Sequence, residues 1–128
     1  MNASVERWLV FAKEDLHAAD ILLKEGVYNQ ACFHSQQCIE KSIKGLYAHL
    51  VGVPPRTHSI TDLLSMIPAE LFADLKEGME SVDDYYIATR YPDALPGTLP
   101  EGLPGDNEAE QLVALARSVL ARVLHIAT

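Results

Sequence analysis

Several features are scarce in this sequence, and each absence excludes a class of protein. Two cysteines are too few for a disulfide scaffold. No uncharged apolar run approaches the roughly 18 residues of a membrane-spanning helix, so no membrane span is expected. No stretch shows the strand-like alternation of apolar and polar residues. The N-terminal segment has neither a basic start nor an apolar stretch, so no secretory signal is expected and the predicted location is cytoplasmic.

Positive charge is also scarce, and it is unevenly placed. Lysine and arginine total 10 against 18 acidic residues, for a net charge of −8. Residues 1–60 carry six basic and six acidic side chains, whereas residues 61–128 carry four and twelve. Neutralised phosphates supply most of the affinity of general nucleic-acid binders, so DNA binding is not expected. A local basic groove remains compatible with this composition.

The remaining composition is that of an ordinary globular domain. Hydrophobic residues make up 48% and charged residues 22% of a chain of 128 residues, which suits a single domain over residues 1–128. Cys32 and Cys38 lie six residues apart in a predicted helix, about 240° around its axis. They cannot readily bond each other or share a metal, and we interpret both as small buried hydrophobic residues.

Apolar residues recur at helical spacing in three long segments. The first helix is predicted over 5–25 and ends at Gly26, the second over about 30–50 with Asn29 as its cap, and the last from 106 or 107 onward. The short first connection makes the first two helices antiparallel. The predicted buried stripes are Val5, Leu9, Ala12, Leu16, Ala19 and Leu23; Cys32, Ser35, Ile39, Ile43, Leu46 and Leu50; and Leu112, Val113, Ala116, Val119, Leu120 and Val123.

The middle of the chain predicts shorter elements. Residues 52–58 form a loop stiffened by two prolines. Ser59 or Thr61 then caps a short helix, and Pro68 fits the first turn of another, which we expect to break at Gly78.

Four prolines spaced four residues apart exclude a helix from residues 91–106, where we expect a Pro-rich arm of extended character. The predicted fold class is therefore all-α. Its architecture is an antiparallel up-and-down bundle of four to six helices.

The second predicted helix carries an unusual polar stretch over residues 35–44. Gln36, Glu40 and Lys44 are four residues apart and form one row. The simplest interpretation is pairing between neighbouring turns on a solvated helix face, worth a few tenths of a kcal/mol per pair. Gln37 fits this poorly, because it borders apolar positions and needs hydrogen-bond partners if it is buried.

Five short motifs follow one another along the chain, from about Glu6 to His125. They are Ala12-x-x-Asp15-Leu16-x-x-Ala19; Gly26-x-Tyr28-x-x-Ala31; Ser35-Gln36-Gln37-x-x-Glu40-Lys41-x-x-Lys44; Thr57-His58-Ser59-Ile60 followed by Leu63-Leu64; and Thr89-Arg90-Tyr91-Pro92-Asp93. Their order resembles the HEPN domain family. The resemblance implies an antiparallel helical bundle that forms a homodimer. It also implies a small prokaryotic protein paired with a minimal nucleotidyltransferase, in a module of the toxin–antitoxin type.

Many members of that family are metal-independent RNases with an Arg-x(4–6)-His motif. This spacing does not occur here: Arg117 and His125 are separated by seven residues. Lys44 and His49 have the spacing, but lysine lacks the bidentate fork that arginine offers to phosphate. We therefore carry no catalytic role onto any residue, and the sequence leans toward a protein that is not an enzyme.

The candidate ligand-binding residues are Gln37, Lys41, Lys44, His58 and Arg90. Each has a structural alternative as well. His58 can be bonded within the bundle, or it can lie with Arg56 near Lys41 or Lys44 and help to hold a phosphate. Arg90 can pair with a carboxylate such as Asp15. Histidine, cysteine and carboxylate spacings typical of a metal site are missing, so no metal is expected and the only expected small-molecule ligand is a nucleotide.

Three functions remain open at this point. The first is an accessory protein that binds a nucleotide, a nucleotidyltransferase partner, or both. The second is a divergent metal-independent RNase, which the acidic balance disfavours. The third is a non-catalytic homo-oligomerisation module, which the sequence does not separate from the first.

Overall fold

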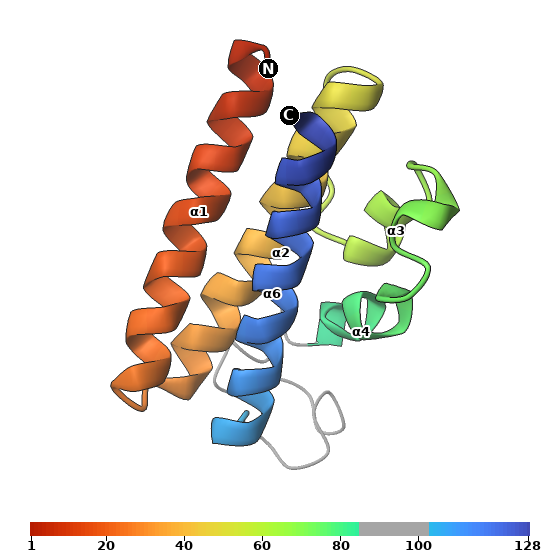
Figure 1. Ribbon diagram of the computed structural model, residues 1–128. Helices are drawn as coiled ribbons and strands as arrows, with labels where there is room; N and C mark the ends of the chain where they lie inside the picture. The colour runs from red at the N-terminus through yellow and green to blue at the C-terminus, as the bar shows by residue number, and fades with distance from the viewer. Residues whose placement is uncertain (85–102) are drawn as a thin grey trace.

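The computed structural model describes residues 1–84 and 103–128, and every regular element in these ranges is a helix. Three long helices form the body of the molecule: α1 (Ala3–Lys24), α2 (Tyr28–Leu50) and α6 (Asp106–Ala127) (Figure 1). The predicted all-α class is confirmed. The first and last of these helices begin within two residues of their predicted starts.

Three short elements lie together beside the long helices (Figure 1). They are α3 (Ile60–Leu64), a single 3-10 turn (Ala69–Leu71) and α4 (Lys76–Ser81). α3 packs against α2 and against α4. These elements lie along the path from the end of α2 to the start of α6, and they place the loop after α2 against the bundle.

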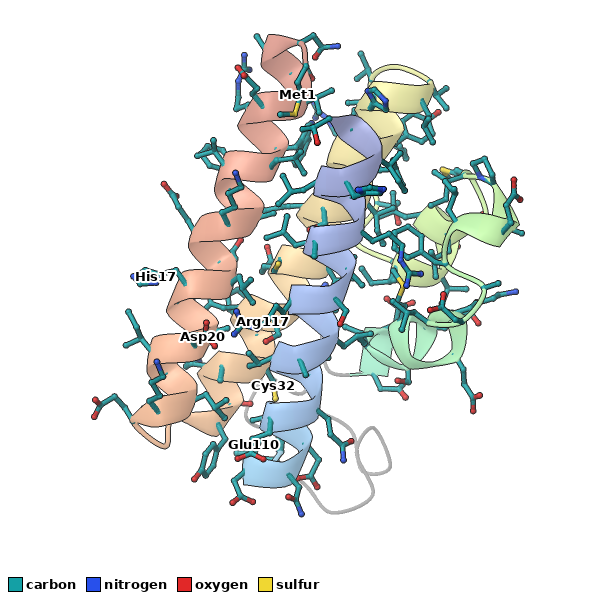
Figure 2. All side chains as sticks on the ribbon, viewed as in Figure 1. Met1, His17, Asp20, Cys32, Glu110 and Arg117 are labelled. Atoms are coloured by element: carbon teal, nitrogen blue, oxygen red, sulfur yellow. The ribbon has the colours of Figure 1, made fainter. Side chains whose placement is uncertain are left out.

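The long helices have two directions. α1 is antiparallel to both α2 and α6, which run parallel to each other (Figure 1). α2 packs against both of the other long helices. Arg117 of α6 and Asp20 of α1 face one another across the bundle, with 2.5 Å between guanidinium nitrogen and carboxylate oxygen (Figure 2). The N- and C-termini lie at the same end (Figure 1).

The core follows the predicted apolar stripes. All six predicted positions of α6 are buried, as are five of the six on α2. Leu50 is the exception, with 42% of its surface exposed, because it is the last residue of α2 and lies at the end of the bundle. Leu16 and Leu23 of α1 are only partly buried against the same core.

The predicted cap of α2 is wrong. Asn29 lies inside the first turn, because the helix already begins at Tyr28. Gly26 turns the chain with a φ of 75°, and the amide of Val27 donates to the carbonyl of Leu22 at 2.8 Å. This tight glycine turn starts the helix before Asn29 can act as its cap.

The predicted break at Gly78 is also wrong, since α4 runs through this glycine. The break comes earlier, between the 3-10 turn and α4. There Phe72 is buried, and the guanidinium of Arg122 lies 5.5 Å from its ring centroid. Arg122 also donates to the Asp74 carboxylate at 2.6 and 2.9 Å, which lowers the pKa of Asp74. Contact with α6 therefore decides where this segment bends, and the helix propensity of glycine does not.

Gly45 of α2 packs closely against Trp8 and Leu9 of α1. A Cβ atom there would lie 2.9 Å from Cδ2 of Leu9 and 3.3 Å from Cβ of Trp8. We expect Gly45→Ala to lower the free energy of unfolding by about 1–2 kcal/mol, because overpacking outweighs the better helix propensity of alanine. Urea denaturation measures this. Gly52→Ala is the matched control, since nothing lies within 4 Å of its added Cβ. An equal decrease in the free energy of unfolding of both variants would contradict close packing at Gly45.

The outer face of α1 keeps apolar side chains in solvent. Val10, Phe11 and Ile21 are each about half exposed. Within residues 1–84 and 103–128, no helix is both long and apolar enough to cross a bilayer.

The homodimer implied by the family resemblance stays a prediction.

Candidate functional site

The polar row of α2 is buried, so its predicted solvated face is wrong. Gln36, Glu40 and Lys44 are 0%, 3% and 5% exposed. The reason is the central place of α2, which other elements cover on several sides. The predicted pairing between turns does form: the Lys44 ammonium donates to Glu40 Oε2 at 3.1 Å.

Glu40 is the centre of this buried network. His58 Nδ1 lies 3.2 and 3.3 Å from its two carboxylate oxygens. Gln36 Nε2 donates to Oε1 at 3.5 Å, and Gln37 Nε2 donates to Gln36 Oε1 at 2.7 Å. A buried carboxylate needs compensating donors, and Glu40 takes them from its own helix and from the loop after it. The side-chain amide of Gln37 thereby gains the partner that its position requires.

A second acceptor, Asp15, links α1 to α2. Lys41 Nζ lies 2.5 Å from Asp15 Oδ2, and His34 Nδ1 lies 2.9 Å from Oδ1. The Lys41 ammonium also lies 5.9 Å from the ring centroid of Phe11. Lys41 therefore holds the two helices together.

An open groove of about 450 Å³ lies where the start of α1, the last turns of α2 and the following loop meet. Pockets of this size accept small organic ligands. The Lys44 ammonium lies 5.5 Å from the Trp8 ring centroid at this groove. Arg56 is exposed and forms no ion pair with any residue in the described ranges. The lining residues are Ser4, Trp8, Lys44, Val53, Pro54, Pro55, Arg56 and His58.

The loop that carries His58 is fixed at its far end. Ser59 caps α3 through its side chain, as one of the two predicted caps. Asp83, two residues after α4, accepts from the backbone amides of Ile60 and Thr61 at 2.7 and 3.1 Å. The chain directly after His58 is therefore held by three side-chain hydrogen bonds to the start of α3.

Both cysteines are buried, as predicted. Burial raises the pKa of Cys32 and of Cys38 to about 12. Both thiols therefore stay protonated near neutral pH and are poor nucleophiles. Neither cysteine takes part in the groove.

The structure brings together some of the predicted site residues. Lys44 and His58 line one groove and share the Glu40 carboxylate. Gln37 joins the same network through its neighbour, whereas Lys41 pairs with another carboxylate and does not line the groove. Arg90 lies outside the described residues, as do residues 91–102 of the predicted arm. Ligand binding by these five residues stays a prediction.

Three further residues were not among the five candidate site residues: Trp8 and Arg56 line the groove, and Glu40 lies beneath it. Glu40 had a signal, since it lies four residues before Lys44 on one helix face. Arg56 had one too, two residues before His58 in the proline-stiffened loop. Trp8 had none, because only the packing of α1 on α2 brings its ring beside Lys44.

Comparison with known proteins agrees with this architecture. A profile of the HEPN domain matches residues 5–126. A Methanocaldococcus jannaschii protein named "Putative toxin MJ1304" is 30% identical over 120 residues, which is 85% of this chain and 78% of that protein. The crystal structure of TT1696 from Thermus thermophilus is similar with a TM-score of 0.80 and 39% identity over 98% of each chain. The structure of ST0689, an archaeal HEPN homologue, gives a TM-score of 0.76 and 33% identity over the full length of both chains. The chain therefore belongs to the HEPN domain family.

Proposed function

We propose that this HEPN protein is an accessory component of a toxin–antitoxin-type module and binds a nucleotide in the groove beside Trp8. One observation carries the proposal: Lys44, Arg56 and His58 come from two separate segments and line one hollow beside an indole ring. The toxin name of the Methanocaldococcus relative supports the type of module.

The electrostatics of the groove suit a phosphate on an otherwise acidic protein. Lys44 is compensated by the Glu40 carboxylate beneath the groove. Arg56 is then the cation available to an anion, and its guanidinium fork matches two phosphate oxygens at once. Local placement of a cation therefore matters more for this site than the net charge of −8.

The apolar part of the groove suits a nucleobase. Trp8 offers the face of an aromatic ring, on which any base can stack. Pro54 and Pro55 form another part of the lining and stiffen the loop opposite. A base against these residues leaves its phosphate near Arg56, which is the arrangement we propose.

The proposed partner is a minimal nucleotidyltransferase, as the family resemblance implies. Support on this chain is an apolar rim next to the groove. Val53, which lines the groove, is 92% exposed, and Val51, two residues before it in the chain, is 63% exposed. A partner that covers these two side chains would also close over the bound nucleotide.

The test uses the single tryptophan of the chain, which lies at the groove. Titration with ATP or AMP should change Trp8 fluorescence saturably. We expect Arg56→Ala to weaken binding by about ten- to a hundredfold, the loss of about 1.5–3 kcal/mol from a charge-assisted hydrogen bond.

Lys24→Ala is the matched control, because it removes the same charge from the far end of α1. Its nucleotide affinity should stay within about a factor of two, since the distance exceeds the screening length in physiological salt. Equal weakening in both variants would indicate attraction to net charge alone. No saturable response at all would overturn the proposed site.

A further inference from the structure

Asp83 does not line the groove, but its carboxylate holds one end of the loop that does. Oδ1 accepts from the backbone amide of Ile60 at 2.7 Å. Oδ2 accepts from the amide of Thr61 at 3.1 Å and from the hydroxyl of Ser59 at 3.2 Å. These are tertiary contacts, and they tie the start of α3 to the chain just after α4.

The first turn of α3 depends on this carboxylate. The first four backbone amides of a helix have no partner within the helix. All four have an acceptor here: the hydroxyls of Thr57 and Ser59 accept one each, and Asp83 accepts the other two. A helix of five residues is too short to be stable by itself, so the loss of Asp83 should loosen its first turn.

The loop before α3 has few other anchors. Within the part of the chain that the structure describes, residues 53–57 form no backbone-to-backbone hydrogen bond. At the α2 end, two loop amides donate to the carbonyl of Tyr47. At the other end, His58 contacts Glu40 and the chain then enters α3. The position of Arg56 therefore depends on how firmly the start of α3 is held.

We propose that Asp83 is a positioning residue of the groove: by holding the start of α3, it keeps Arg56 where the guanidinium can meet a phosphate group beside Trp8. This inference rests on the proposed function. It adds that affinity depends on a carboxylate that does not line the groove. By charge alone, an acidic side chain weakens binding of an anion. Removal of Asp83 therefore separates the two effects by the sign of the change in affinity.

The first test measures the loop without any ligand. Nitrogen-15 relaxation gives backbone order parameters, and we expect about 0.85 at Arg56 and Thr57 in the unaltered protein. In Asp83→Ala these two values should fall below about 0.6, whereas those of α2 should not change. Unchanged order at both residues would overturn the proposal and leave nucleotide binding standing.

The second test measures the affinity for AMP through Trp8 fluorescence. We expect Asp83→Ala to weaken binding about tenfold, which corresponds to about 1.4 kcal/mol. Asp83→Asn keeps one acceptor oxygen and should lie between Asp83→Ala and the unaltered protein. Asp84→Ala is the matched control, because it removes the same charge from the next residue, whose side chain is exposed. This control should bind AMP as tightly as the unaltered protein or slightly more tightly, and equal weakening in Asp83→Ala and Asp84→Ala would overturn the proposal.

A double variant distinguishes positioning from a general loss of stability. If Asp83 acts through Arg56, then Asp83→Ala should weaken AMP binding by less than about twofold when Arg56→Ala is already present, because coupled residues are not additive. The full tenfold loss in both backgrounds would overturn the proposal. No AMP binding to the unaltered protein would overturn both this inference and the proposed function. Loss of loop order together with a loss of affinity that requires Arg56 would support both.

Discussion

Glu40→Ala is expected to lower the free energy of unfolding by about 3–5 kcal/mol, because it leaves a buried cation without its partner. The Lys44 side chain is only 6% exposed and its ammonium lies against the Trp8 ring. The free energy of unfolding of a single domain is about 5–15 kcal/mol, so the variant should still fold but be markedly less stable. Urea denaturation followed by circular dichroism measures the change.

A double variant tests whether the lost stability comes from the unpaired buried charge of Lys44. Glu40→Leu with Lys44→Met removes both charges and keeps apolar volume, so most of the lost stability should return. The stability of Glu40→Gln should lie between that of Glu40→Ala and that of the unaltered protein, since its amide oxygen still accepts a hydrogen bond from Lys44. An exposed ion pair between neighbouring turns of a helix contributes only a few tenths of a kcal/mol to the free energy of unfolding. A loss as small as this in Glu40→Ala would contradict the burial of Gln36, Glu40 and Lys44.

Asp15→Ala is expected to lower the free energy of unfolding by about 2–3 kcal/mol, because two donors on α2 lose a shared acceptor. The Asp15 side chain is 11% exposed and accepts from Lys41 and His34. The change should appear as a lower urea midpoint with an unchanged slope.

Asp20→Ala is the matched control on the same helix. Asp20 also pairs with a cation of another helix, Arg117, but the arginine side chain is 55% exposed (Figure 2). Exposed ion pairs contribute about 0–1 kcal/mol, so this control should change stability little. If the two aspartate variants lose equal stability, burial is not what makes Asp15 matter.

Most of the fold could be predicted from apolar spacing. The stripe of α6 is a continuous helical pattern, and all of its predicted residues are buried. The row of Gln36, Glu40 and Lys44 could not be assigned this way, because its composition is that of a solvated face. Its burial comes from the central position of α2, which is a property of the whole bundle.

The candidate site was predictable only where its residues are neighbours along the chain. Lys44 lies on the polar face of α2, and His58 lies in the loop that follows this helix. Their connection runs through Glu40, whose role depends on the fold of the loop. Trp8 is far from Lys44 and His58 in the sequence. It reaches the groove because α1 packs closely against α2 at Gly45. Sequence spacing does not report such tertiary contacts.

The measurement that tests the central claim most directly is a chemical-shift map of the nitrogen-15-labelled protein with AMP. We predict saturable shifts at the Trp8 indole, at Arg56 and at His58, all at one groove. A separate hollow of about 210 Å³ between α3 and α4, which Lys76 and Glu80 line, should stay unchanged. Shifts that gather at that hollow, or none at saturating AMP, would contradict nucleotide binding at the groove.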